Sequence, residues 1–450
     1  MLLDREAEPA PVRAVHLGLG GFHRAHQAWY TAADPEWGIA AYTFRSTELP
    51  AALTAQGGMY SLLVRGADDP VRTVGSLSRA HAGAEADQWL ADLAAPEVAV
   101  VTLTATEAAY RVPPPGRDSA ISRLVAGLRA RFRASAAPIT LVPCDNVPDN
   151  GAVLRSVLRE AAADGDAAFA AWLEAGVLVV STVVDRITPA TTPADVRVVH
   201  ELSGIRDAVP VVTEPYAEWL LAGDFPGGRP RWERAGARLV DSVDDYQRRK
   251  LWLLNGAHSL LAYAGPGRGR GTVREAMDDP VLAGLVESWW DTAARHLPLP
   301  AAELDEYRAA LRRRFAAPGV EHRLRQIAVD GSQKIPARVL PVLHRERGAG
   351  RLPEAAVVVL AAWIAHFRGG DVHDPRSADL VPAARSGARA VLAALDADLA
   401  SDDELIAAID AEVPGTAGDE LSGVRAGGPP PATPWQVVAT DCRGCPASLA

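Results

Sequence analysis

The most constraining feature of this chain is an alternation of short β-branched runs with Ala-, Leu- and Arg-rich segments, which continues to about residue 240. The β-branched runs are "VRAVHLG" (12–18), "GIAAYTF" (38–44), "EVAVVTLT" (97–104), "APITLVPC" (137–144), "GVLVVSTVV" (176–184) and "AVPVVTE" (208–214). Continuous apolar runs of this length, separated by helical segments, are typical of buried parallel strands. We therefore predict an α/β sheet with helices on both faces.

After about residue 245 the strand pattern nearly stops and long helical patterns follow, such as 301–315 and 353–369. A mostly α-helical second domain is the natural interpretation. We predict an α/β domain over residues 1–243, a helical domain over 244–425 and a loose tail over 426–450. The tail carries "CRGC" (442–445), which could be half of a zinc site, but Cys144 is the only other cysteine. Its Gly- and Pro-rich approach favours a loose tail instead.

Composition excludes several classes of partner. The formal net charge of −10 argues against a nucleic acid held through its phosphates. No run is long and apolar enough to span a membrane, and the acidic, proline-containing start does not fit a signal peptide. Three cysteines are too few for a disulfide framework and fit a reducing compartment. We expect a cytoplasmic protein without a membrane or nucleic-acid partner.

The first run leads into a glycine-rich turn, "VHLGLGGFHRAH". Gly18, Gly20 and Gly21, followed by Phe22, would allow a tight turn and a close backbone approach before a helix begins. A pyrophosphate could then lie at the helix N-terminus, where free N–H groups favour an anion. The pattern is an incomplete G-x-G-x-x-G because His23 replaces the third glycine. Its place between a strand and a helix indicates nucleotide binding.

The end of the second run should select the nucleotide. An acid there would bind the ribose hydroxyls of NAD, whereas an arginine could accept the additional phosphate of NADP. The sequence is "YTFRSTEL", so Arg45 and Ser46 occupy this place and Glu48 is the nearest acid. The choice between NAD and NADP stays open at this point.

Three further strand ends are unusually polar. Ligands of doubly wound sheets bind beyond the carboxyl ends of the strands. For Asn146 and Asp185 we expect a role in the site, whereas "DNG" (149–151) is ordinary turn and cap chemistry. The polar residues at these ends are Thr104, Thr106 and Glu107, then Asp145 and Asn146, then Asp185 and Arg186.

The segment "KLWLLNGAHSLLAYAG" (250–265) reads as a buried helix interrupted by Lys250, Asn255 and His258. At about 100° per residue, all three fall within an arc of about 140°. A lysine in a dry cleft has a lowered pKa and can act as a general base. An amide can donate to an oxygen that becomes negative, and a histidine can orient the substrate. Such a set suits removal of a hydroxyl proton while hydride leaves the same carbon.

Each of the three residues also has an ordinary explanation. A helix lysine is usually solvated, Asn255-Gly256 could mark a helix break, and His258 could be a core histidine. Their joint position on one face of an apolar helix, downstream of a nucleotide-type domain, favours the site.

The sequence resembles the long-chain polyol dehydrogenases, the mannitol dehydrogenase family, over nearly its whole length. The resemblance rests on the order and spacing of "HLGLGGFHRAHQAWYT", "LTATEAAY", "CDNVPDNG", "VDRITP", "EPYAEWLLAGDFPGGRPRWERAGARLVDSV", "KLWLLNGAHSLLAYAG" and "QIAVDGSQKIPARVLP". It implies a Rossmann-type doubly wound N-terminal domain, a mostly α-helical C-terminal domain and an active site between them.

The resemblance also implies roles for individual residues. Lys250 would be the general base, and Asn255 and Asn146 would form an oxyanion hole. His258 would orient the substrate and Asp185 would support the site electrostatically. Lys334, in "DGSQK" (330–334), would lie near the substrate.

The cofactor implied by the resemblance is NAD, and Gly18, Gly20, Gly21, Phe22, Arg45, Thr104 and Thr106 would contact it. NAD-preferring members often carry an acid where this chain has "FRST" (44–47), so NADP is not excluded. Catalysis in the family needs no metal. We expect a monomer that acts on a small polyol, ketose or hexuronate.

The substrate has two candidate classes. The first is a sugar alcohol and its ketose, of the mannitol and fructose type; the alternative is the mannonate and fructuronate pair. A uronate needs a cation for its carboxylate, and Lys334, Arg338 or Arg186 could serve. From other classes, the chain could be a catalytically inactive dinucleotide-binding sensor or a metal-dependent dehydrogenase. A pure sensor would have no need of a base such as Lys250.

Overall fold

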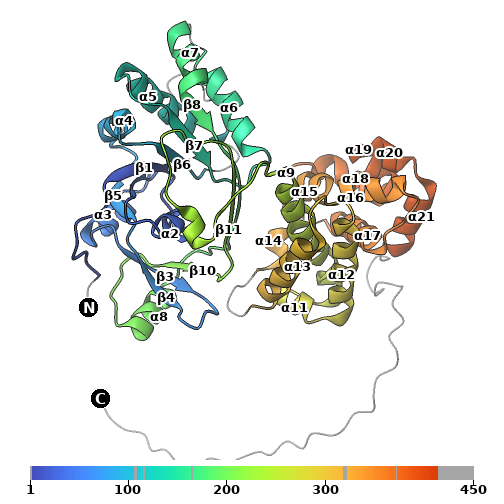
Figure 1. Ribbon diagram of the computed structural model, residues 1–450. Helices are drawn as coiled ribbons and strands as arrows, with labels where there is room; N and C mark the ends of the chain where they lie inside the picture. Colours follow the sequence, from blue (N-terminus) through green and yellow to red (C-terminus); the bar gives the residue numbers. More distant parts are fainter. Residues whose placement is uncertain are drawn as a thin grey trace, which may run out of the picture.

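The N-terminal half is built on a six-stranded parallel sheet with the order β5-β2-β1-β6-β7-β8 (Figure 1). The chain starts at the centre of the sheet and extends to both sides, which is the doubly wound order of dinucleotide-binding folds. The computed structural model describes residues 3–105, 109–112, 114, 117–163, 166–317, 322–370 and 372–413. The strands of this sheet are β1 (Val12–Leu17), β2 (Gly38–Tyr42), β5 (Leu77–His81), β6 (Val100–Leu103), β7 (Ile139–Pro143) and β8 (Val177–Val179).

Both faces of this sheet are buried, which explains why its strands read as continuous apolar runs. In β1, Val15 and Leu17 pack into one hydrophobic cluster while Ala14 packs into another on the opposite face. The first cluster is completed by α4 (Ala86–Ala94), α5 (Ala120–Arg133), α6 (Asn150–Ala161) and α7 (Ala167–Gly176).

The opposite face is covered by short helices and two small sheets, whose orders are β10-β3-β4 and β12-β11-β9. The helices on this face of the sheet or at its edges are α1 (Gly21–Ala25), α2 (Gln27–Thr31), α3 (Glu48–Ala55) and α8 (Pro193–Ser203), with the 3-10 turn η2 (Trp232–Ala235). The strands of the small sheets are β3 (Tyr60–Val64), β4 (Val71–Val74), β9 (Ser181–Asp185), β10 (Val211–Thr213), β11 (Glu218–Ala222) and β12 (Arg238–Leu239).

One predicted strand, 176–184, is wrong as a single element, because the chain leaves one sheet for another at Val180. The residues before it, β8, pair with β7, whereas β9 pairs antiparallel with β11. Val180 is fully buried, and its N–H donates to the carbonyl of Leu141 at 3.0 Å. The crossing carries Asp185, at the end of β9, toward the C-terminal half.

The C-terminal half is helical, as predicted, and a single hydrophobic core extends from Trp252 to Ile409. The predicted helices 301–315 and 353–369 are α13 and α17. α17 is buried nearly all round, which marks it as the central helix, and it packs against α10. The helices are α9 (Asp244–Arg249), η3 (Lys250–Asn255), α10 (Gly256–Ala264), η4 (Pro266–Arg268), α11 (Val273–Met277), α12 (Pro280–Ala294), α13 (Ala301–Ala316), α14 (Leu324–Ile327), α15 (Gly331–Arg338), α16 (Leu340–Gly348), α17 (Glu354–Arg368), α18 (Ser377–Ser386), α19 (Ala388–Leu395), α20 (Ala397–Ala400) and α21 (Asp403–Glu412).

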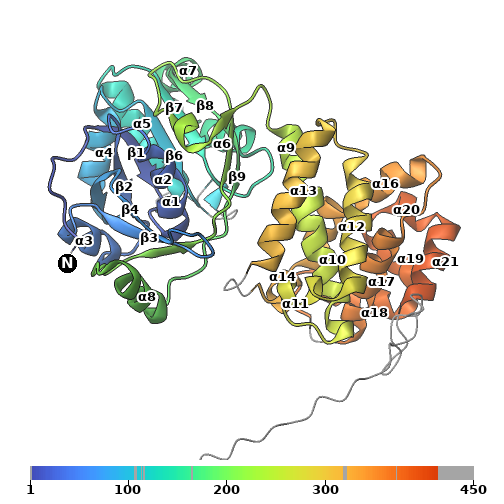
Figure 2. The same cartoon turned by 60° about the horizontal axis from the view of Figure 1, so that its bottom comes forward.

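The two halves meet where β9 and α9 pass between them, with α13 on the side of the helices that faces the sheets (Figures 1 and 2). The predicted division between residues 243 and 244 falls at the start of α9. The predicted tail, 426–450, lies outside the described residues. Within the described part of the chain, no helix is both long and apolar enough to cross a membrane.

Candidate active site

The glycine turn after β1 has one position that requires glycine. Gly18 has a φ of +111°, and a Cβ there would lie 2.0 Å from the carbonyl oxygen of Thr104. Its N–H donates to Tyr42 at the end of β2, and the Thr104 hydroxyl donates to its carbonyl, both at 2.8 Å. The turn is therefore tied to the ends of both neighbouring strands. Gly20 precedes α1 and Gly21 is its first residue.

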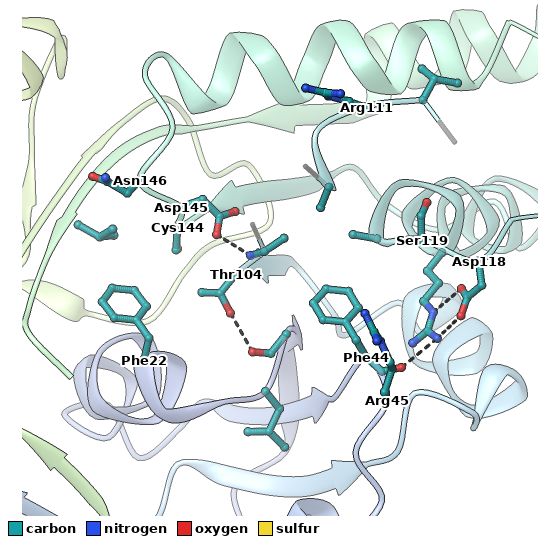
Figure 3. A pocket seen from close by; sticks show the side chains of 18 of the residues that line it. Phe22, Phe44, Arg45, Thr104, Arg111, Asp118, Ser119, Cys144, Asp145 and Asn146 are labelled. Carbon is teal, nitrogen blue, oxygen red and sulfur yellow. Dashed lines mark hydrogen bonds and ion pairs between the residues drawn. The ribbon is translucent and has the colours of Figure 1, made fainter. Parts of the chain in front are cut away.

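A pocket of about 970 Å³ lies beyond the carboxyl ends of β1, β6 and β7 (Figure 3). Phe44 and Arg45 line one part of it, and Asn146 and Lys250 line another. Figure 3 shows Phe22 and Asn146 on the opposite side of the view from Phe44 and Arg45. Gly18 and Thr104 complete the floor, whereas Thr106, also predicted to bind the cofactor, lies outside the described residues.

Exposed arginines form part of the pocket lining. They are Arg45, Arg111 and Arg117. The carboxylate of Asp118 also lines the pocket but is held by both Nε and Nη2 of Arg123 (Figure 3). This part of the pocket therefore suits a ligand that carries phosphate.

Asp145 fixes the backbone at the end of β7. Its carboxylate accepts hydrogen bonds from the N–H of Ala105, at 2.5 Å, and from the hydroxyl of Tyr110. Burial raises the pKa of Asp145 to about 7, and both hydrogen bonds act in the opposite direction. Asn146, which follows directly, is thereby held at the wall of the pocket.

Lys250 reaches the same strand ends from the helical half. Its Nζ donates to Oδ1 of Asn146 at 2.8 Å and to the carbonyl of Val184 at 2.7 Å. The side chain is partly buried, and this burial is the main reason that the pKa of Lys250 is lowered. Arg314 lowers this pKa further, while Asp185 raises it.

The lysine belongs to a π-helical segment, η3, where we predicted a regular α-helix. Because i→i+5 hydrogen bonds close a π turn, Lys250 and Asn255 lie nearer one face than the predicted arc of about 140°. The indole N–H groups of Trp289 and Trp290 donate to the carbonyls of Trp252 and Leu253, at 2.7 and 2.9 Å. These two donors satisfy backbone oxygens inside the irregular turn, and π segments of this kind are frequent at functional sites.

Asn255 and His258 have different surroundings. Asn255 lines a second cavity, of about 390 Å³, together with Asn146 and Lys250. The ring of His258 stacks on Phe315 at 4.9 Å between centroids. Burial lowers the pKa of His258 well below its usual range, so the imidazole is neutral at neutral pH. Its buried Nε2 has no hydrogen-bond partner within the described residues.

A buried ion cluster joins the two halves beside Lys250. Arg314, on α13, donates to both oxygens of Asp185, at 2.7 and 2.9 Å, and to both oxygens of Glu214, at 3.0 and 2.8 Å. Burial alone would raise the pKa of Asp185, but Arg314 and Lys250 outweigh it and hold the value at about 2. Asp185, which ends β9 in the N-terminal half, is therefore an anion whose cationic partners come from the helical half.

Neither Arg314 nor Glu214 was predicted from the sequence to belong to the site. Arg314 stands in "LRRRF" (311–315), a pattern that looks like the solvated face of a helix. Glu214 ends a predicted strand, and this position was the one feature of the sequence that could have identified it as a site residue. The roles that we predicted for Lys250 and Asp185 stay predictions, although both side chains lie at the same junction.

Two of the three predicted carboxylate-binding cations are held by the backbone. Nζ of Lys334 donates to the carbonyls of Ile327, at 3.1 Å, and Val329. Ile327 is the last residue of α14 and Val329 lies in the turn between α14 and α15, so the ammonium fixes the end of that helix and the turn after it. Its predicted contact with substrate stays a prediction.

Arg186 is engaged in the same manner. Its guanidinium donates to the carbonyl of Ala25 at 2.5 Å and to that of Glu214 at 3.2 and 3.3 Å. It also lies over the ring of Trp29, 4.5 Å from the centroid. Such a set of contacts joins α1 to the strand ends.

In the part of the chain that the structure describes, no three or more His, Cys, Asp or Glu residues are arranged to hold a metal ion. The groups that lie at the junction are the lysine, the two amides, the neutral imidazole and the ion cluster.

Comparison with known proteins matches both halves of the chain to one family. Residues 12–234 match the family described as the mannitol dehydrogenase Rossmann domain, and residues 242–414 match the mannitol dehydrogenase C-terminal domain. The chain is 34% identical to D-mannonate oxidoreductase of Escherichia coli (strain K12), over 80% of each chain. It is 31% identical to mannitol 2-dehydrogenase of Cereibacter sphaeroides, over 79% of this chain and 80% of that one.

A solved structure is also similar. It is the ternary complex of Pseudomonas fluorescens mannitol 2-dehydrogenase with NAD and D-mannitol, which is 31% identical in sequence. The match covers 91% of this chain and 92% of that chain, with a TM-score of 0.75.

Proposed function

The chain belongs to the mannitol dehydrogenase family, and from that premise we propose that it interconverts a secondary alcohol and its ketone on a sugar-derived substrate, with Lys250 as general base. Its class is that of an oxidoreductase that uses a nicotinamide dinucleotide. The single observation that carries the proposal is the position of Lys250 Nζ, in hydrogen-bond contact with Asn146 and Val184 at the wall of the nucleotide-type pocket.

The pocket has the features that a dinucleotide needs. Its floor is the tight turn at Gly18, the exposed arginines of its lining suit phosphate, and another part borders Lys250. We propose NAD as the cofactor, as in the related Pseudomonas complex. Arg45 would also accommodate the additional phosphate of NADP, so both cofactors belong in the assay. A bound nicotinamide supplies the acceptor for hydride.

The hydrogen bonds of Lys250 favour its action as a base. Its two acceptors, Oδ1 of Asn146 and the carbonyl of Val184, can take both N–H groups of a neutral amine. The lone pair of that amine is then left for the hydroxyl proton of the substrate. Because burial lowers the pKa of Lys250, a larger fraction is neutral near pH 7 than for an exposed lysine. The proton taken from the alcohol would reside on Nζ.

The two amides suit stabilisation of the reacting oxygen. Since Oδ1 of Asn146 accepts from Lys250, its NH₂ group is turned away from the lysine and can donate to the substrate. Asn255 lines the same second cavity and would supply the other donor. Neutral His258 would orient a substrate hydroxyl. Asp185 would limit how far the pKa of Lys250 falls, because its negative charge favours the ammonium.

The proposal is tested by the absorbance of reduced nicotinamide. Purified protein is given mannitol, arabinitol or mannonate with NAD or NADP, and fructose or fructuronate with the reduced cofactors. We expect turnover with at least one pair, unchanged by a strong chelator. If both cofactors bind but no substrate turns over, the protein is a sensor. If activity disappears with the chelator and returns with zinc, the lysine mechanism is wrong.

A further inference from the structure

Arg338, the last residue of α15, is the one of the three candidate cations that is not tied to backbone carbonyls within the described residues. Its guanidinium donates from Nη1 to the hydroxyl of Ser259 at 3.2 Å. In the described part of the chain, no carboxylate lies within ion-pair distance of it. Lys334 and Arg186, by contrast, already donate to two carbonyls each.

The environment of Arg338 makes an unpaired charge costly. The side chain is partly buried, and burial lowers its pKa to about 10, so it is still a cation at neutral pH. Arg314, the buried guanidinium of the ion cluster, has by contrast two carboxylate partners. A charge withdrawn from water needs a counter-charge or strong hydrogen bonds. A single neutral hydroxyl does not meet that need, whereas an anionic ligand would.

The position of Arg338 connects it to the proposed reacting centre. α15 packs against both η3 and α10, the elements that carry Lys250, Asn255 and His258. Burial is the main cause of the lowered pKa values of Lys250 and His258, and the positive charge of Arg338 lowers both further. Its partner Ser259 directly follows His258.

The spacing matches a short carbon chain. Ser259 lies one α-helical turn beyond Asn255, a rise of about 6 Å. Four carbon–carbon bonds in an extended chain span about 5 Å, from single bonds of about 1.5 Å. A carbonyl carbon near Asn255 and a carboxylate near Arg338 could therefore belong to one six-carbon molecule.

We propose that Arg338 binds a terminal carboxylate of the substrate, so that the preferred pair is a sugar acid and its keto acid rather than a neutral sugar alcohol and ketose. This inference rests on the proposed function, which it makes more specific. The planar guanidinium can donate two parallel hydrogen bonds to a carboxylate, and the Ser259 contact at Nη1 fixes the plane of the fork. A neutral polyol would leave the guanidinium without its anion.

The test compares mannonate with mannitol in the wild-type chain and in Arg338→Gln. We expect the wild-type kcat/KM for mannonate to exceed that for mannitol by at least about 100-fold. Arg338→Gln should lower the mannonate value by about 100-fold, mainly through KM, because one partner of a charge pair is lost. The kcat/KM for mannitol should change by no more than about threefold, because an uncharged contact contributes far less than a charge pair.

Two further variants serve as controls. Arg338→Lys keeps the charge but not the fork, and should recover part of the mannonate activity. Arg325→Gln removes an exposed arginine from nearby α14 and should leave the preference for mannonate unchanged. Equal losses on mannonate and mannitol in Arg338→Gln, or a wild-type chain that prefers mannitol, would overturn the inference and leave the dehydrogenase function intact.

Calorimetry separates this inference from the proposed function. If no substrate of the panel turns over, the proposed function fails, and mannonate is then titrated into the protein loaded with NAD. Tighter binding of mannonate than of mannitol, lost in Arg338→Gln, would support the carboxylate site on its own. Equal binding of the two compounds, or no binding of mannonate, would overturn it.

Discussion

Replacement of Gly256 by alanine tests whether the π turn is fixed by the tryptophans that pack on it. A Cβ at Gly256 would lie 2.5 Å from Nε1 of Trp289 and 2.9 Å from its Cε2. The indole cannot easily move, because it is 1% exposed and its N–H donates to Trp252 at 2.7 Å. The new methyl group must therefore displace Trp289 and weaken the hydrogen bond that satisfies the turn.

Three effects set the change in the free energy of unfolding: the first favours alanine and the other two disfavour it. Helix propensity alone favours alanine over glycine by about 1 kcal/mol. Overpacking of a filled core costs about 1–3 kcal/mol. Loss of a buried hydrogen bond costs about 1–3 kcal/mol more, because donor and acceptor stay buried. We expect Gly256→Ala to lower the free energy of unfolding by about 3 kcal/mol, a magnitude that these effects together support.

Urea unfolding monitored by tryptophan fluorescence measures this change. Gly284→Ala is the matched control, since Gly284 is exposed in the middle of α12 and a Cβ there would have no neighbour within 4 Å. The control should gain up to about 1 kcal/mol. If Gly256→Ala is as stable as the wild type, the turn is not held by Trp289. The kcat of Gly256→Ala should also fall, because Lys250 and Asn255 would move apart.

The remaining predictions concern the ion cluster and the pocket rim. Arg314→Met leaves two buried carboxylates without their cation, so urea unfolding should show a free energy of unfolding lower by about 3–5 kcal/mol. A variant as stable as the wild type would contradict a stabilising role of the ion cluster. The pKa of Asp185, held at about 2, means that its ionised form stabilises the fold above about pH 4, and that this stability is lost as the pH falls toward 2. Asp185→Asn should remove this part of the acid dependence of urea unfolding, and an unchanged acid limb would speak against the ion pair. Arg45→Ala should weaken NADP binding more than NAD binding in fluorescence titrations, whereas equal losses would show that Arg45 does not face the ribose phosphate.

The sequence predicted the parallel sheet well because its strands are buried on both faces and appear as uninterrupted apolar runs. It missed β4 and β5, which are partly exposed and therefore have no such run, and it also missed β3, although that strand is buried throughout. The change of sheet at Val180 was also missed, because the apolar run continues across it. Periodicity reports burial but not which sheet a strand joins.

The candidate site could be predicted most readily where its residues lie along one local stretch. Lys250, Asn255 and His258 stand out because polar groups interrupt an apolar helix. The π turn could not be predicted, since its extra donors come from tryptophans 37 residues away. Arg314 could not be predicted for a similar reason. Its partners Asp185 and Glu214 lie 129 and 100 residues away in the sequence, and Arg314 is buried only in the folded chain.

The role of Lys250 as general base is tested most directly by single-turnover hydride transfer in Lys250→Ala, alongside a titration of the cofactor. The reduced nicotinamide is followed by absorbance across a range of pH with the preferred alcohol in excess. We predict a rate at neutral pH lower by at least about 100-fold, a typical contribution of general base catalysis, with cofactor affinity nearly unchanged. A rate near that of the wild type, with the same dependence on pH, would contradict the lysine as the base.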